Sequence, residues 1–236
     1  MTTLPSAQRS TEIVAFREKV KAAALARVTT QPGSGRGRLI FALDATASRE
    51  PTWDQACRIQ GEMFEATAGL GGLDLQLVFY RGYAECKASR WLSNPAALHR
   101  VMRSVSCAGG ETQIGRVLDH AIRETRKRKV SALVLVGDAM EEKADRLCRL
   151  SGELGALGVP IFLLHEGCDP DAAAAFRQMA TLSRGAYLAF DLASIDPLKE
   201  LLGVIAVYAT GNRAALAAYG AQKGGAVLRL TAQLKG

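Results

Sequence analysis

The chain has 236 residues, of which 48% are hydrophobic and 22% charged, and its formal net charge is +7. This composition allows a sizeable hydrophobic core and excludes both a disordered chain and a small domain stapled by disulfides. No apolar stretch is long enough to cross a membrane and no signal-peptide core is evident, so we expect neither a membrane span nor a secretory leader.

The amino-terminal part is predicted to be an appendage of the main domain. Apolar residues recur at helical spacing from Ser10 to Arg27, which indicates a helix. The segment Thr29–Gly37 is rich in glycine, proline and hydroxyl residues, which is typical of a flexible linker. We therefore assign residues 1–37 to an N-terminal helix and linker.

Strand and helix patterns alternate through residues 38–210, which we assign to one domain, with residues 211–236 as a C-terminal extension. Strands are predicted at Arg38–Leu43, Leu73–Tyr80, Ala84–Trp91, Val130–Val136, Pro160–His165 and Ala186–Phe190. Helices are predicted at Thr52–Ala68, Pro95–Ser104, Thr112–Arg128, Glu141–Leu157, Pro170–Leu182 and Pro197–Ala209. This order predicts a doubly wound, Rossmann-like α/β fold with a mainly parallel central sheet and helices on both faces. The turn around Gly82 is too short for a crossover, so the strand after it is expected to be an antiparallel edge strand.

The cysteines and histidines form no pattern that predicts a disulfide framework or a zinc site. The five cysteines are scattered and include no C-x-x-C pair, and the three histidines form no H-E-x-x-H pattern. Reduced thiols and a cytoplasmic location are therefore expected.

The first predicted strand of the main domain ends in an aspartate, Asp44, and two hydroxyl residues, Thr46 and Ser48, follow at alternate positions. Hard cations such as Mg²⁺ prefer oxygen ligands, and a carboxylate with two hydroxyls supplies them without excess negative charge. A buried strand gains nothing from such an ending. The pattern therefore predicts part of a cation site.

Two further oxygen-bearing residues are predicted to reach the same crevice. Asp138 follows the fourth predicted strand, and Thr112 lies in the glycine-rich segment Gly109–Gly115. Ligands of open α/β sheets bind beyond the carboxyl ends of the strands, where the strand order reverses. In a doubly wound order the first and fourth strands are neighbours there, and the glycines allow the Thr112 backbone to approach closely.

In this arrangement the chain resembles the von Willebrand factor type A (vWA) domains, in particular intracellular bacterial-type members. Their metal-ion-dependent adhesion site (MIDAS) reads Asp-x-Ser-x-Ser, followed by a distant Thr and a distant Asp. The resemblance covers residues 38–207, and the five positions are matched, in order, by Asp44, Thr46, Ser48, Thr112 and Asp138. Threonine at position 46 replaces the commonest residue but keeps its hydroxyl.

The resemblance implies a function for these residues. The three hydroxyls would contact Mg²⁺ or Mn²⁺ directly or through water, while Asp44 and Asp138 would hold coordinated waters and balance charge. An open coordination position would accept an Asp or Glu carboxylate from a partner protein. The resemblance further implies a non-enzymatic adaptor, including one within an assembly that contains an AAA+ ATPase or a chaperone. The last helix resembles the family's final helix, which in some members slides to alter affinity.

Several alternatives compete with this interpretation. Asp44, Thr112 and Asp138 are also residue types that cap helices and turns, and Glu141 and Glu142 suit the first turn of a helix. A phosphohydrolase of the haloacid dehalogenase type also places an aspartate after its first strand, but it needs a second carboxylate at position 46 for acid–base work. A nucleic-acid partner is not expected, because the basic run at residues 123–129 suits a helix C-terminus and no RNA-binding aromatic signature accompanies it.

Overall fold

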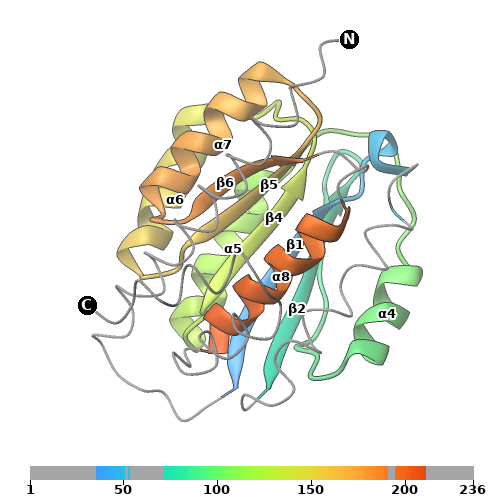
Figure 1. Ribbon diagram of the computed structural model, residues 1–236. Coiled ribbons are helices and arrows are strands. Elements are labelled where there is room, and N and C mark those ends of the chain that lie inside the picture. Colours follow the sequence, from blue (N-terminus) through green and yellow to red (C-terminus); the bar gives the residue numbers. More distant parts are fainter. Residues whose placement is uncertain (1–35, 51–52, 54–71, 191–194, 211–236) are drawn as a thin grey trace.

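The computed structural model of the protein describes residues 36–50, 53, 72–190 and 195–210. Its strands form one six-stranded sheet in the order β3-β2-β1-β4-β5-β6 (Figure 1). The strands are β1 Gly37–Asp44, β2 Leu73–Arg81, β3 Glu85–Ala88, β4 Ala132–Gly137, β5 Ile161–Glu166 and β6 Ala186–Phe190. All neighbouring pairs are parallel except β2 and β3, which are antiparallel. The predicted sheet and its antiparallel edge strand are confirmed.

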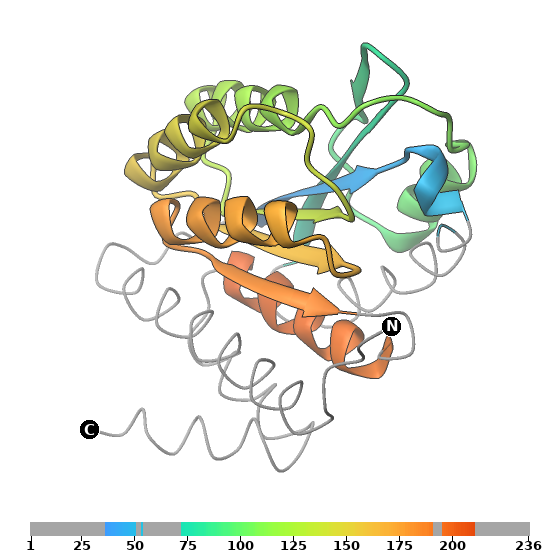
Figure 2. The ribbon, with the colours of Figure 1, turned by 90° about the horizontal axis from the view of Figure 1, so that it is seen from above.

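Helices cover both faces of the sheet. The described helices are α4 Pro95–Arg103, α5 Ile114–Lys127, α6 Ala144–Ala156, α7 Pro170–Leu182 and α8 Ile195–Thr210, with a short 3-10 helix, η1, at Ala47–Arg49. Helices α5, α6 and α7 pack in one hydrophobic core, whereas α4 and α8 contribute to the other. Figure 2 shows these two layers on opposite sides of the strands.

The strands bury side chains on both faces, which accounts for their nearly continuous apolar sequences. Along β1, Leu39, Phe41 and Leu43 enter the core with α4 and α8, whereas Ile40 and Ala42 enter the core with α5, α6 and α7. Full burial of one large aliphatic or aromatic side chain contributes about 1.5–3 kcal/mol. The two cores therefore hold the sheet ends, and any site built on them, in fixed positions.

Some elements are shorter than predicted, for identifiable reasons. Helix α5 begins at Ile114 rather than Thr112, and α6 begins at Ala144 rather than Glu141. Thr112 and Glu141 instead bond to each other across the two loops. Strand β3 ends at Ala88, because the hydroxyl of Ser89 rather than its carbonyl accepts a hydrogen bond from the Leu77 amide.

Several predicted segments lie outside the described residues. They are the helix at Ser10–Arg27, most of the linker, the helix at Thr52–Ala68 apart from Trp53, and the extension at residues 211–236. Across the part of the chain that is described, no helix is long and apolar enough to cross a membrane.

Glycine at position 185 allows the start of β6 to approach β5, and its replacement tests this packing. An alanine Cβ at Gly185 would lie 1.9 Å from the carbonyl oxygen of Ile161, which is backbone and cannot swing away. We expect Gly185→Ala to lower the free energy of unfolding by about 3 kcal/mol, measured by denaturant titration. Gly152, inside α6, has open space around its Cβ position, so Gly152→Ala should raise that free energy by about 0.5–1 kcal/mol. Equal effects of the two substitutions would contradict the described approach of β6 to β5.

Candidate metal centre

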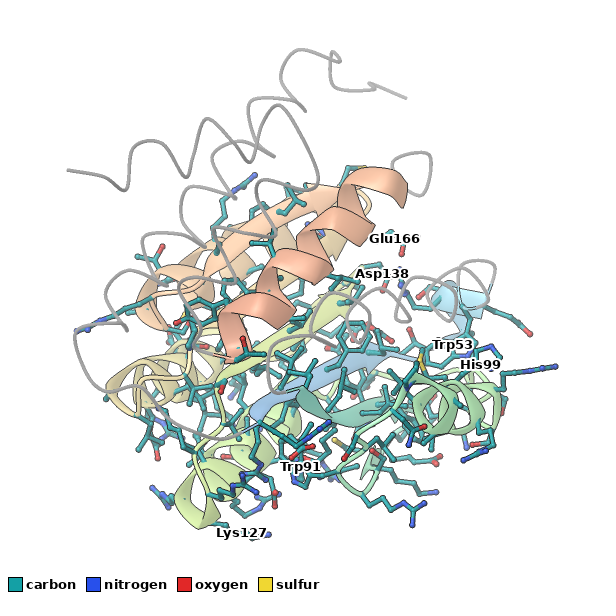
Figure 3. The ribbon with its side chains drawn as sticks, turned by 60° about the horizontal axis from the view of Figure 1, so that its bottom comes forward. Trp53, Trp91, His99, Lys127, Asp138 and Glu166 are labelled. Atoms are coloured by element: carbon teal, nitrogen blue, oxygen red, sulfur yellow. The ribbon has the colours of Figure 1, made fainter. Side chains whose placement is uncertain are left out.

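The parallel pairing of β1 and β4 brings two of the predicted residues together. Leu43 lies opposite Val136, so Asp44 and the residues after β4 share one end of the sheet. A Cβ placed on Gly137 would lie 3.8 Å from the Cβ of Asp44 and 3.9 Å from its Oδ2. Asp138 follows directly, at the end of β4 (Figure 3). The predicted pairing of the first and fourth strands is thus confirmed, and it places Asp44 and Asp138 at the same end of the sheet.

The Asp44 carboxylate is buried and held from both sides. Oδ1 accepts a hydrogen bond from the Thr46 amide at 2.7 Å, and Oδ2 accepts one from the Tyr80 hydroxyl at 3.1 Å. Burial raises the pKa of Asp44, against the opposing effect of its bonds to Thr46 and Tyr80. Burial and the nearby Asp44 charge raise the pKa of Tyr80 well above its usual value, so this phenol remains a neutral donor. The orientation of Asp44 is therefore fixed before any ligand arrives.

The two hydroxyls after Asp44 converge. A 3-10 turn, closed by the Arg49 amide on the carbonyl of Thr46 at 3.0 Å, places the Thr46 and Ser48 hydroxyl oxygens 3.0 Å apart. Thr46 is buried, whereas Ser48 is exposed. The pair thus lies at the boundary between the protein and solvent, where an ion and a second molecule can reach it.

Thr112 is bonded to the loop after β4, and another residue of the loop that carries it is bonded to the loop after β1. Its amide donates to Glu141 Oε2 at 2.7 Å, and its Oγ1 accepts from the Glu141 amide at 3.1 Å. Upstream in the same loop, the Ala108 amide donates to the carbonyl of Ala45 at 3.1 Å. These bonds tie the Thr112 loop to the loop after β1 and to the loop after β4. Thr112 Oγ1 keeps a second lone pair for another partner.

One of the two adjacent glycines in this loop allows a close backbone approach, to the turn between β2 and β3 rather than to the ends of β1 and β4. A Cβ on Gly110 would lie 2.2 Å from the carbonyl oxygen of Gly82, in the turn between β2 and β3, whereas a Cβ on Gly109 would meet open space. The amide of Glu111 donates to the same Gly82 oxygen at 3.2 Å. Gly110 is thus the position that allows the loop to dock.

The oxygen atoms gathered here fit a hard cation. Oδ1 of Asp138 is buried and has no hydrogen-bond partner among the described residues, which is costly for a carboxylate unless a cation or water compensates it. In the described part of the chain, no group of three or more His, Cys, Asp or Glu side chains could hold a metal by itself. Hydroxyl oxygens are therefore needed to complete a site, and Mg²⁺ and Mn²⁺ accept such oxygen ligands.

An ion pair that sequence reasoning missed lies beside the aspartates. Arg49, only 3% exposed, pairs with Glu166 at the end of β5, and Figure 3 shows Glu166 beside Asp138. Burial lowers the pKa of Arg49, while the negative charges of Asp138 and Asp44 oppose that shift. Glu166 follows the same rule as Asp44, because it stands at the carboxyl end of a strand next to the switch point. That rule could have found Glu166, whereas nothing in the sequence distinguished Arg49.

The acidic pair Glu141 and Glu142 differs from its predicted position, and His165 is a neighbour of the site that the sequence did not predict. Glu141 and Glu142 precede α6 rather than opening it, and the Glu142 carboxylate accepts a hydrogen bond from the Gly115 amide at 3.0 Å, at the start of α5.

The buried His165 lies with Nε2 3.2 Å from the carbonyl oxygen of Asp138 and Nδ1 2.9 Å from the Tyr187 hydroxyl. The carbonyl can only accept, so Nε2 carries the proton, and burial lowers the pKa of His165 and favours this neutral form. His165 therefore fixes the backbone of Asp138.

Known proteins resemble this chain in structure but not detectably in sequence. No protein-family model matches the sequence, and no curated protein matches it. Solved structures do match. A von Willebrand factor type A protein from Catenulispora acidiphila aligns with a TM-score of 0.58 at 16% identity, over 75% of this chain and 43% of that one.

Two metal-bearing structures are also similar. Proximal thread matrix protein 1 from the mussel byssus, with a zinc-occupied MIDAS motif, gives a TM-score of 0.56 at 16% identity, over 73% of this chain and 46% of that one. Manganese-loaded TRAP protein of Plasmodium vivax gives 0.53 at 14% identity, over 72% and 74%. The chain thus spans less than half of the first and second of these three relatives. At such identities the likeness concerns the fold, and the described part of the chain has the von Willebrand factor type A fold.

Proposed function

We propose that the protein is a metal-dependent interaction module that binds an acidic side chain of a partner protein through Mg²⁺ or Mn²⁺. The observation that carries this proposal is the buried Oδ1 of Asp138, which has no hydrogen-bond partner among the described residues and lies at the same end of the sheet as Asp44. The metal-loaded structures of the same fold support it.

The proposed roles follow from the chemistry of each side chain. The hydroxyls of Thr46, Ser48 and Thr112 hold the ion directly or through water, and Asp44 and Asp138 hold its waters and balance its charge. A bound ion supplies Lewis acidity, and a ligand set with few anions leaves that acidity available to an incoming carboxylate. The exposure of Ser48 gives a partner's Asp or Glu access to the site.

The site is pre-organised, which favours tight binding. The Thr46 amide and the Tyr80 hydroxyl already hold Asp44, and Glu141 already holds Thr112. Because these groups are ordered before binding, less conformational entropy is lost when the ion and the partner arrive. Residues that hydrogen-bond to metal ligands and orient them usually affect metal affinity nearly as much as the ligands themselves.

An adaptor function inside a cytoplasmic assembly, including one built around an AAA+ ATPase or a chaperone, belongs to the same proposal. The alternative, a metal-dependent phosphohydrolase, is less well supported at position 46. An acid–base carboxylate is needed there, but the residue is Thr46, whose hydroxyl lies 3.0 Å from that of Ser48. We therefore propose binding rather than catalysis.

Removal of the Asp138 carboxylate tests the metal site. We expect Asp138→Ala to weaken Mg²⁺ and Mn²⁺ binding by about 10–100-fold in calorimetry on the protein alone, without lowering the melting temperature. Glu153→Ala serves as the charge-matched control, because Glu153 lies on α6 and forms an ion pair with Arg126 outside the site. Unchanged metal affinity in Asp138→Ala would refute the proposed site.

Partner capture tests the functional half of the proposal. Pull-downs should recover the partner in Mg²⁺ and lose it in EDTA, and Asp138→Ala should lose it in both. Capture that persists in EDTA would contradict a metal-dependent module. Phosphatase turnover that disappears in Asp44→Asn would favour the hydrolase instead.

The Gly110 contact gives an independent test, since Gly110 supplies no ligand. Gly110→Ala should displace the Thr112 loop and weaken Mg²⁺ binding about tenfold, as loss of a positioning contact does at other metal sites. Gly109→Ala, next in the chain and facing open space, should leave the affinity unchanged. If both variants bind Mg²⁺ like the parent protein, the Thr112 loop does not contribute to the site.

A further inference from the structure

We propose that the edge strand β3 and the adjoining side of α5 form a second binding surface, which takes an acidic, extended peptide of a partner protein by antiparallel strand addition. A groove of about 270 Å³ separates the two elements. Its walls include Cys86 and Ala88 from β3, and Arg116, His120 and Arg123 from α5. This volume suits a few side chains of a peptide whose backbone lies along β3.

The backbone of β3 has hydrogen-bonding groups on its outer side that no other described strand uses. Ser89 lies opposite Leu77: its amide donates to the carbonyl of Leu77, and the Leu77 amide donates to the Ser89 hydroxyl, so the hydrogen-bonding groups of this pair face each other across the strands. In an antiparallel ladder such pairs alternate with pairs whose N–H and C=O groups point away from each other. The N–H and C=O groups of Cys86 and Ala88 therefore face away from β2. Within the described chain β3 is the last strand on this side of the sheet.

The side chains on this face leave room for a ligand. Cys86 lies opposite Tyr80 and Ala88 opposite Val78, and Tyr80 and Val78 pack in the core with α5. The small side chains of Cys86 and Ala88 consequently point to the α5 side. Burial raises the pKa of Cys86 to about 11, so its thiol is neutral and carries no charge that would repel an acid.

The opposite wall of the groove is basic. Arg116 and Arg123 are both exposed and lie seven residues apart, or two helical turns, on one side of α5. Asp119 lies between them, but it forms an ion pair with Arg146 at 3.0 Å. His120 is bonded to Gln76 Oε1 at 2.8 Å, and burial lowers its pKa. Two guanidinium groups thus dominate the charge of this wall.

Arg116 reaches from α5 to the backbone next to β3. Its Nη1 donates to the carbonyl oxygen of Ala84 at 2.9 Å, directly before β3. A guanidinium has five N–H donors, so most of them stay available to a carboxylate. In antiparallel addition, the peptide residues opposite Cys86 and Ala88 would point to the same side as those side chains, towards Arg116 and Arg123. Acidic residues at these alternate positions complement the wall.

Charge and surface chemistry select this occupant over others. The chain's own segment 211–236 contains Arg213, Lys223, Arg229 and Lys235 and no Asp or Glu, so the two arginines repel it. Among the described residues, no Phe, Tyr or Trp lines the groove to stack on bases, and a nucleic acid would leave the strand's backbone groups unpaired. An extended acidic peptide uses both the edge and the charge, as in other cases of strand addition.

Fluorescence anisotropy in EDTA tests this surface independently of the metal site. The probe is a labelled peptide of alternating Glu and Thr, compared with one of alternating Lys and Thr. We expect the Glu peptide alone to bind, and Arg116→Glu/Arg123→Glu to weaken it by about tenfold or more. The matched control is Arg100→Glu/Arg103→Glu, which makes the same charge change at exposed positions of α4 on the other face. Melting temperatures show that each variant folds.

N-methylation of the peptide distinguishes strand addition from attraction to any polyanion. Methylation of the Glu amides removes the N–H groups that would bond to β3 and should abolish binding, whereas methylation of the Thr amides should preserve it. Equal binding of the two methylated peptides, or equal competition by single-stranded DNA, would overturn the proposal. So would the absence of binding by the unmodified Glu peptide. None of these results bears on Mg²⁺ affinity, so this proposal can fail while the metal site stands.

Discussion

Hydrogen bonding between the parallel strands β1 and β4 places the ends of two chain segments, far apart in sequence, next to each other. Asp44 and Asp138 extend from these ends, and the Thr112 loop is bonded to both neighbours through Ala45 and Glu141. Side chains on both faces of the sheet bury these strands in two cores. The spacing of the oxygen atoms is therefore set by backbone pairing and core packing, and a ligand does not have to assemble the site.

Burial of charge at the site has an electrostatic consequence. Asp44, Asp138 and Glu166 bring three carboxylates to one end of the sheet, and Arg49 brings one guanidinium. Removing charged groups from water is costly unless they are paired. Arg49 thus offsets part of the repulsion among these carboxylates.

Structure could be predicted from the sequence most accurately where it depends on the residues of a single element. The strands were predictable because burial on both faces gives continuous apolar runs, and Asp44 and Asp138 could be placed together from strand order alone. The starts of α5 and α6 were placed too early because Thr112 and Glu141 bond across two loops, and no local propensity encodes that contact. The Arg49–Glu166 pair was missed for the same reason, since it joins residues on separate elements.

The contact of Gly110 with Gly82 joins the two regions to which we assign different binding functions. Gly82 lies in the turn that leads into β3, and Gly110 lies in the loop that carries Thr112. The side-chain amide of Gln113 also donates to the carbonyls of Arg81 and Gly82. The two regions are therefore in direct contact, so a displacement of one would be transmitted to the other. Thermodynamic linkage is reciprocal, so if both proposed sites bind, any factor by which a peptide on β3 changed the ion affinity would be the factor by which the ion changed the peptide affinity.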